Sequence, residues 1–320
     1  MDIQPVFPRA IDSTMLACSG CEMKFFIEYC LRRGPTTKSP DLHAGGAFAS
    51  AIETTRRAYW FHKKSKEESL FDGVRTLMDY WGGYEPPDKY NRPHVKTFVN
   101  TVGALDSYFL EYPLDKDPFE IDINDKGEPS LEFTFAVPLP IAHPVTGDPV
   151  LYAGRCDAIG SYAGIPCAAD EKTTASIGRR WGGQWNMRGQ FLGYVWAAQQ
   201  YGYNLNSMLV RGIAIQVSQY QHIFELVTYP QFIIDRWADK MVNKIQSLVD
   251  CFQKMKFEYS FGDACASYGG CWATSICERE KPEDWYSSYP ERIWDPLEKD
   301  PLHSNEAPGA NLSETRLDTF

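Results

Sequence analysis

Two neighbouring segments of strand-like sequence place acidic residues where they constrain both the fold and the chemistry of this chain. Asp157 lies in the run PVLYAGRCDAIGS and Asp170 in the run GIPCAADEKTT, with residues 162–164 as a plausible turn between them. Side chains at i and i+2 of a strand share a face, so Asp170 and Lys172 project together. Pairing the two strands across the turn brings Asp157 beside Asp170. Two adjacent carboxylates repel each other unless a cation lies between them.

The rest of the chain predicts the elements of an α/β layered domain. Alternating apolar residues predict another strand at 131–139, joined to the Asp157 strand through a hairpin connection at 143–148. Apolar periodicity, turn residues and capping residues predict a helix at 13–32 capped by Ser13 or Thr14, a helix at 47–64 after Gly45-Gly46, helical and irregular sequence at 65–120, a helix at 184–203, strands at 207–218 and 222–229, and a helix at 231–256 after Pro230. This order predicts a single domain with a mixed central sheet flanked by helices.

The two carboxylates and the lysine together predict a metal-dependent hydrolytic site. Hard oxygen ligands suit Mg²⁺ or Mn²⁺. A lysine beside such a metal can orient an attacking water and stabilise charge on a phosphate. Asp157, Asp170 and Lys172 are therefore candidates for the hydrolysis of a phosphodiester. Taken alone, the three residues also fit an ordinary charged hairpin on the surface.

Residues outside the two strands favour the catalytic interpretation. Glu53, on the helix after the glycine pair, is placed to be another acidic metal ligand. Gln190 and Tyr194 are four residues apart, so they share one face of a helix. Arg188 and Trp185 lie nearby in the sequence and can contact a DNA backbone or base.

Three cysteines are evenly spaced as C-x5-C-x5-C in the segment 261–278, at Cys265, Cys271 and Cys277. A loop that contains Gly269-Gly270 can wrap three thiolates around one soft metal centre, which is either a 4Fe-4S cluster or zinc. Zinc ligands are usually spaced more tightly, as C-x2-C, so the wider spacing favours the cluster. The alternative is that these are free buried cysteines, which suits the apolar surroundings of Cys156, Cys167 and Cys251.

In order along the chain, Cys21, GGAFASAIE, GRCD, DEKTT, QFLGY and C-x5-C-x5-C span about residues 13–278. This series resembles the RecB-type branch of the PD-(D/E)XK nuclease superfamily, which includes CRISPR-associated exonucleases and recombination-type exonucleases of bacteriophages. Each motif is weak alone, whereas their joint order is fairly specific. The resemblance implies a restriction-endonuclease-like core, with N- and C-terminal segments joined by an iron–sulfur cluster.

By position, the resemblance implies roles for the residues of the two acidic strands. It implies that Asp157 is the first metal-binding aspartate and that Asp170 is the (D/E) of the motif. It further implies that the main-chain carbonyl of Glu171 is another metal ligand and that Lys172 is the catalytic lysine. Activity would then release the 3′-oxygen and leave a 5′-phosphate.

The helices match the family less completely. Gln190 and Tyr194 match its Q-x-x-x-Y motif, which supports the site and contacts DNA. The family commonly has a metal-binding histidine in a G-x-x-x-H pattern, and Ala49 stands at that position here. His43 precedes the glycines and is not expected to substitute, so Glu53 is the candidate replacement. This departure puts the second metal position in doubt.

The resemblance also implies the fourth ligand of the cluster. In the family this cysteine lies near the N-terminus, in a segment that reads roughly S-x-L-x-x-Y-x-x-C-P-x-x-F. The spacing from Ser13 to Cys21 and then to Phe25 fits, so Cys21 is preferred, with Cys18 as the main competitor over Cys30. A cluster on Cys21 and the 261–278 loop joins segments about 240 residues apart, and its binding energy adds to folding.

The net charge of −10 is the main objection to a nucleic-acid ligand, because affinity for phosphates comes from Lys and Arg. Nine acidic and four basic residues follow residue 280, however, so half of the excess charge lies in the last 40 residues. We expect a nuclease domain at 1–280, which includes the cysteine segments 13–32 and 261–278, and an extended or disordered acidic tail at 281–320. No membrane span or signal peptide is predicted, so the expected location is the cytoplasm.

These observations predict a Mg²⁺- or Mn²⁺-dependent DNA exonuclease with a 4Fe-4S cluster, acting in recombination, repair or phage DNA processing. A single-strand annealing protein is the partner suggested by the resemblance, and a host cytoplasm the location if the source is viral. Three alternatives stay open: a CRISPR adaptation nuclease, a non-catalytic DNA-binding or scaffold protein that retains the fold, and a zinc-stapled interaction protein.

Overall fold

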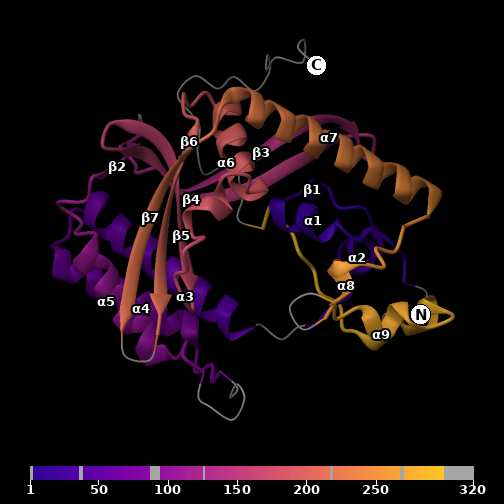
Figure 1. The fold of residues 1–320 in the computed structure, drawn as a ribbon, viewed down its shortest axis with the longest axis horizontal. Coiled ribbons are helices and arrows are strands. Elements are labelled where there is room, and N and C mark those ends of the chain that lie inside the picture. Colours follow the sequence, from indigo (N-terminus) through magenta and orange to yellow (C-terminus); the bar gives the residue numbers. More distant parts are fainter. Residues whose placement is uncertain are drawn as a thin grey trace.

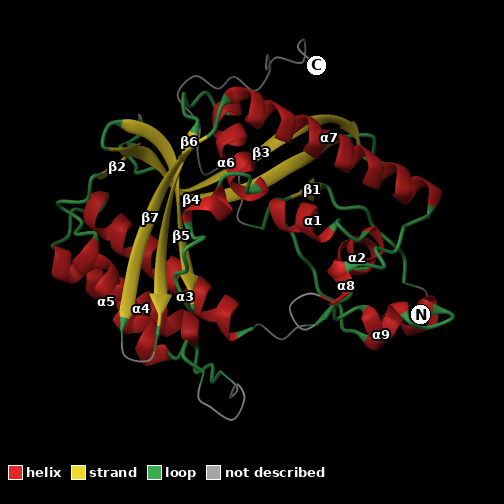
Figure 2. Cartoon of the chain, viewed as in Figure 1, coloured by secondary structure: helices red, strands yellow, loops and turns green. Residues whose placement is uncertain are grey.

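A mixed seven-stranded sheet forms the centre of the computed structural model, which describes residues 3–35, 39–86, 94–124, 127–216, 219–266 and 270–298 (Figures 1 and 2). The strands are β1 (Ala10–Ile11), β2 (Phe119–Ile121), β3 (Leu131–Ala142), β4 (Pro149–Tyr162), β5 (Ile165–Thr174), β6 (Ser207–Ile215) and β7 (Tyr220–Thr228). The prediction of a mixed α/β fold with helices around a central sheet is confirmed.

The sheet is built around β4. Strand β3 pairs with β4 antiparallel through the predicted connection at 143–148, and β4 pairs antiparallel with β5 through the predicted turn at 163–164. Strand β5 is parallel to β6, and β6 forms an antiparallel pair with β7. The short strand β1 lies parallel to β4 at Leu151 and Tyr152, while β2 pairs with the far end of β4.

Helices cover both faces of the sheet (Figure 1). They are α1 (Ser13–Cys18), α2 (Glu22–Phe25), the π-helix η1 (Phe26–Cys30), α3 (Pro40–Trp60), α4 (Lys66–Trp81), α5 (Phe98–Glu111), the 3₁₀-helix η2 (Gly182–Trp185), α6 (Gly189–Gln200), α7 (Gln231–Lys254), α8 (Asp263–Ala266), α9 (Thr274–Cys277) and the 3₁₀-helix η4 (Pro282–Ser288). None of the described helices has the length and apolar character that crossing a membrane requires.

Two cores form because strand side chains alternate between the faces. Even-numbered residues of β5 and β6, such as Ala168 and Met208, pack in the larger core with α6 and α7. Odd-numbered residues, such as Ala169 and Leu209, lie on the other face, which α3 and α5 cover. The sheet therefore separates side chains of β5 that are adjacent in the sequence.

The helix predicted at 47–64 begins earlier, at Pro40, with the Ser39 side chain capping the main-chain N–H of Leu42. The glycine pair lies inside this helix and does not start it. Gly46 is required for packing, because a Cβ there would lie 2.2 Å from the hydroxyl of Tyr80 on α4. The pair therefore allows α3 and α4 to approach each other.

The helix predicted at 13–32 is divided into α1, α2 and η1. Its N-cap is Asp12, whose carboxylate accepts the N–H of Met15 at 2.8 Å, and not Ser13 or Thr14 as predicted. The interruption at residues 19–21 places Cys21 at the N-cap position of α2, which turns the chain at the cysteine.

The segment predicted as an extended tail from residue 281 differs up to residue 298. It contains η4 and then packs against the N-terminal segment, where Arg292 pairs with Glu28 at 2.9 Å and the Trp294 indole donates to Asp12 at 2.9 Å. The prediction was wrong for this part because it was based on the acidic composition, whereas individual aromatic and polar side chains make specific contacts with the N-terminal segment. The rest of the predicted tail, 299–320, lies outside the described residues.

Candidate active site

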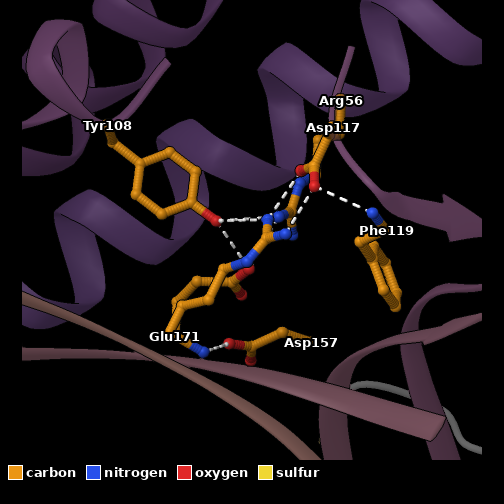
Figure 3. A network of polar contacts seen from close by, with 7 residues as sticks. Arg56, Tyr108, Asp117, Phe119, Asp157 and Glu171 are labelled. Carbon is orange, nitrogen blue, oxygen red and sulfur yellow. Dashed lines mark hydrogen bonds and ion pairs between the residues drawn. The ribbon is translucent and has the colours of Figure 1, made fainter. Parts of the chain in front are cut away.

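The candidate site lies where β4 and β5 separate. Their ladder runs from Tyr162 and Ile165 to Ala158 and Ala169, and the next residues along the two strands are Asp157 and Asp170. One carboxylate oxygen of Asp157 accepts the main-chain N–H of Glu171 at 2.7 Å (Figure 3). This contact fixes the Asp157 side chain at the end of the ladder and directs it toward β5.

Strand β3, which pairs with the other edge of β4, is irregular opposite Asp157. Leu131 pairs with Ala158 and Phe133 with Cys156, so Glu132 stands opposite Asp157. Glu132 has a positive φ of 53°, a backbone conformation that costs energy in a residue with a Cβ. Irregular positions of this kind re-aim side chains near functional sites, although nothing in the local sequence signals one here.

Asp170 and Lys172 project to the same face of β5, as predicted, and form an ion pair. Burial raises the pKa of Asp157 well above its usual 3.8, and the nearby charge of Asp170 raises it further. Burial also raises the pKa of Asp170, although Lys172 opposes the shift. Burial lowers the pKa of Lys172, but the charges of Asp170 and Asp157 outweigh this and raise it overall. The site thus combines two carboxylates that resist ionisation with a stable ammonium.

These three side chains line a cavity of about 650 Å³. Helix α6 contributes Gln190 and Tyr194, and the Gln190 amide donates to the Tyr194 hydroxyl at 2.8 Å. Gln190 and Tyr194 therefore lie on one face of α6, as their spacing predicted, and that face borders the cavity. Five of the candidate residues identified in the sequence therefore line the same cavity.

The main-chain position of Glu171 also borders the cavity, but its side chain leaves on the opposite face of the sheet. There the carboxylate pairs with Arg56 at 2.7 Å and accepts the Tyr108 hydroxyl at 3.0 Å (Figure 3). Burial alone raises the pKa of Glu171, but the charge and hydrogen bond of Arg56, the neighbouring Asp157 and the charge of Arg211 lower it to about 2. Glu171 is thus an ionised structural anchor on its side-chain face.

Lys96 is a residue of this cavity that sequence reasoning missed. It is only 3% exposed, pairs with Asp41 at 2.9 Å and contacts the Thr173 hydroxyl at 3.4 Å. Its position depends on how the segment before α5 packs against α3 and β5. No local pattern around residue 96 could have indicated that contact.

The structure does not bring Glu53 to the cavity. Its carboxylate pairs with Arg57 at 3.1 Å, one helical turn away, while Ala49 lines the cavity instead. His43 is buried among aromatic rings, and its ring nitrogen lies 3.3 Å from the Trp81 carbonyl. Neither Glu53 nor His43 therefore supplies a ligand in place of the missing histidine.

Trp185 does not offer a surface for DNA. It is 7% exposed and packs edge-to-face on Trp181, so its expected contact with a base is wrong. Arg188 is exposed, and its charge lowers the pKa of Asp170, which places it within electrostatic reach of the site. The aromatic residues Phe191, Trp196 and Tyr201 are buried in the core.

The four predicted cluster cysteines gather at the junction of the N- and C-terminal segments. Burial raises the pKa of Cys277 to about 11, and the nearby thiols of Cys21, Cys271 and Cys265 raise it in that order. The main-chain N–H of Cys271 donates to the Cys265 carbonyl at 2.9 Å. Segment 21–26 also meets the chain before the loop, where the Phe26 and Phe257 rings stack at 4.4 Å.

Neither candidate metal site is a closed group of ligands. Among the residues that the structure describes, no three His, Cys, Asp or Glu side chains converge closely enough to hold a metal ion. Residues 267–269, inside the predicted cysteine loop, lie outside the described residues. The donor chemistry nevertheless fits in both places: hard carboxylates in the cavity and soft thiols at the cysteine junction.

No model of a known protein family and no curated protein matches this chain. Among solved structures, the chain is similar to a candidate exonuclease from Eubacterium rectale, with a TM-score of 0.42 and 14% identity over 78% of this chain and 81% of that one. It is also similar to SSO0001, with a TM-score of 0.29 and 13% identity over 78% of this chain and 88% of that one. At these values the likenesses carry no argument about chemistry, which rests on the site itself.

Proposed function

We propose that the chain is a metal-dependent nuclease that hydrolyses phosphodiester bonds in DNA. The observation that carries the proposal is the meeting of the Asp157 and Asp170 carboxylates with the Lys172 ammonium in one polar cavity. Burial raises the pKa of both carboxyls, so holding them ionised side by side is costly, and a divalent cation between them removes the repulsion. Groups of this kind concentrate at functional sites.

The metal-binding role is assigned to Asp157 and Asp170, with the main-chain carbonyl of Glu171 as the further ligand. Two carboxylates are few for a dedicated cage but suit Mg²⁺ or Mn²⁺, which retain water and take oxygens from a substrate phosphate. When bound, the ion supplies a Lewis acid for the phosphate and lowers the pKa of a bound water.

The remaining side chains of the cavity orient the reactants. Lys172 positions the attacking water and offsets charge on the phosphate, while Asp170 holds its ammonium in place. Tyr194 and Gln190 form one hydrogen-bonded unit on α6 that faces the same space. Lys96, which is itself buried, adds a second cation at the cavity wall, where it can pair with a phosphate oxygen.

The resemblance to RecB-type nucleases favours cleavage from DNA ends, in recombination, repair or phage DNA processing. We further propose that Cys21, Cys265, Cys271 and Cys277 hold a 4Fe-4S cluster, with zinc as the alternative. The gathering of these thiols around Cys277 supports this ligand set. A single-strand annealing partner stays a prediction from the resemblance alone.

The test is cleavage of end-labelled linear DNA by the protein purified without oxygen and supplied with Mn²⁺ or Mg²⁺. Asp170→Asn and Lys172→Ala should each lower the cleavage rate by at least about 100-fold, because each removes a group that acts on the reacting phosphate. Glu53→Gln is the matched control, since Glu53 lies off the cavity. Comparison of linear with closed circular DNA separates cleavage at ends from internal cleavage.

A non-catalytic DNA-binding role is the second candidate, and Ala49 favours it. This residue lines the cavity at the position of the family histidine and offers no ligand atom. That role predicts DNA binding that Lys172→Ala leaves intact, together with no cleavage by the unaltered protein under any tested metal. Circular dichroism of each variant shows whether a lost activity reflects lost folding.

A further inference from the structure

A second groove adjoins the catalytic cavity and continues it along the surface. It has a volume of about 670 Å³ and lies between α1, the start of α6 and one side of α7. Ser13, Thr14 and Gln190 line both the groove and the cavity. A chain molecule lying in the groove therefore leads directly to the site of Asp157 and Asp170.

The groove is positively charged although the protein is acidic overall. Four cations line it, at Arg188, Arg236, Lys240 and Lys244, and none of the described lining residues is acidic. Lys244 pairs with Glu22 at 3.0 Å, whereas no ion pair joins the other three to a described residue. The net charge of −10 thus conceals a local surface of the opposite sign.

The cations of α7 are spaced for a linear polyanion. Arg236, Lys240 and Lys244 follow each other at intervals of four residues, so they share one side of the helix. Four residues advance a helix by about 6 Å, so each cation can contact a separate phosphate along an extended strand. Arg188 lies at the start of α6, two residues before Gln190, which lines both the groove and the catalytic cavity.

Aromatic and apolar side chains form the rest of the surface. Trp237 lies between the cations of α7, and its ring packs 5.5 Å from the Tyr152 ring, centroid to centroid. Its indole also lies against Gly189, where an added Cβ would approach within 3.2 Å. Met187, which is 71% exposed, adds apolar surface at the rim. Such side chains contact base faces that are open in a single strand but stacked inside a duplex.

The geometry points to this groove as the binding track for one unpaired nucleic-acid strand, which it delivers to the catalytic cavity. The inference rests on the proposed nuclease function and adds the substrate class: a single strand, or a duplex end that has been opened. The phosphates bind the row of cations on α7, and the bases face Trp237 and Met187. The shared border at Gln190 then places the strand's backbone beside Lys172.

The test measures binding separately from cleavage. Fluorescence anisotropy of labelled oligo-dT is followed for the full chain, purified without oxygen, with no divalent metal added. Arg236→Ala with Lys240→Ala removes two exposed cations of the groove. Each phosphate contact contributes about 0.7 to the slope of log affinity against log salt, so the slope should become shallower by about 1.4. The same relation predicts affinity about 25-fold weaker at 0.1 M salt.

Arg75→Ala with Lys116→Ala is the matched control, because it removes one exposed Arg and one exposed Lys on the side of the sheet covered by α4 and α5. This variant should bind oligo-dT as the unaltered protein does. An equal loss in both double variants, or none in the groove variant, overturns the inference. A blunt duplex that binds as tightly as oligo-dT also overturns it.

The two proposals can fail separately. Loss of oligo-dT binding in the groove variant supports the track even when the unaltered protein cleaves no DNA, which would count against the nuclease. Cleavage that depends on Asp170, with binding unchanged in the groove variant, keeps the nuclease and removes the track. Oligo-U is measured in parallel to distinguish DNA from RNA as the bound strand. If the groove variant loses as much affinity for oligo-U as for oligo-dT, the groove recognises any single strand.

Discussion

At the scale of single residues, the site maintains an electrostatic conflict that folding alone does not explain. Asp157 and Asp170 stand just beyond the last rung of the β4–β5 ladder, where burial raises the pKa of both and the charge of Asp170 raises the pKa of Asp157 further. A chain selected only for stability would replace one of them with a neutral residue. In the proposed nuclease, a divalent cation bound between the two carboxylates would relieve this conflict.

Asp157→Asn should raise the stability of the metal-free protein while it abolishes metal-dependent cleavage. An asparagine oxygen can still accept the Glu171 N–H, and the substitution removes the cost of burying a carboxyl that ionises freely only in the unfolded chain. The expected gain is on the order of 1 kcal/mol, or about 2–4 °C in the midpoint of thermal unfolding. Thermal unfolding at neutral pH without divalent metal measures it.

The pH dependence of this gain follows from the direction of the shift. The pKa of Asp157 is raised above 3.8 in the folded state, so the folded protein keeps a proton that the unfolded chain has lost. Stability of the unaltered protein therefore falls as pH rises from 3.8 toward the folded pKa. The advantage of Asp157→Asn should be largest above that window and vanish below pH 3.8. An advantage that persists in acid would contradict the electrostatic explanation.

At the scale of elements, side chains of β5 make ion pairs on both faces of the sheet. Glu171 anchors β5 to α3 through Arg56 on one face, so that its neighbours Asp170 and Lys172 face the cavity on the other. A second buried pair joins Arg211 of β6 to Asp117 at 2.5 Å. Successive side chains of β5 point to opposite faces of the sheet. The charge of Glu171 therefore anchors the strand, while the charges of its neighbours Asp170 and Lys172 face the cavity.

Arg56→Ala should destabilise the protein strongly, whereas Arg57→Ala should not. Arg56 is 2% exposed and its removal leaves the buried Glu171 carboxylate without its cation, which typically costs about 3–5 kcal/mol. Arg57 is 38% exposed and pairs with Glu53 on the surface, a contact worth less than about 1 kcal/mol. Chemical denaturation of the two variants measures the difference. Similar losses in both would show that the buried pair does not anchor β5.

Elements with local signals were predictable, and those set by packing were not. Turn residues at 143–148 and 163–164 identified both hairpins, and the i, i+2 rule placed Asp170 and Lys172 on one face. The glycine pair gave a wrong prediction of where the helix begins, because Gly46 is needed for the close contact with Tyr80 and does not start the helix. Lys96 had no signal, since tertiary packing alone brings it to the cavity.

At the scale of the whole molecule, charge is distributed unevenly, so the net charge is a poor guide to whether the protein can bind a nucleic acid. The net charge of −10 argues against a nucleic-acid ligand. The groove of α7 nevertheless presents cations beside the acidic cavity. Solubility depends on the total charge, whereas recognition of a strand depends on the surface that it touches.

The ends of the described chain are also held together by contacts other than the cysteines. The Arg292 N–H donates to the Arg32 carbonyl at 2.8 Å, and Met23 donates to Glu258 at 3.1 Å. These contacts position Cys21 near Cys277. The proposed cluster would therefore add to a junction that main-chain hydrogen bonds also hold.

Cys21→Ser should lose the bound metal, whereas Cys18→Ser should keep it. Burial and the Glu28 carboxylate raise the pKa of Cys18, which disfavours the thiolate that a metal requires. Its thiol also lies 3.7 Å from Glu28 and has a partner already. Iron and zinc content, visible absorbance and thermal unfolding of the two variants, purified without oxygen, measure the difference. Loss of the metal should lower the midpoint of Cys21→Ser by more than about 4 °C, which exceeds 1 kcal/mol for a chain of this size. Equal metal content in the two variants would remove Cys21 from the ligand set, and zinc in place of iron would make the junction a zinc staple.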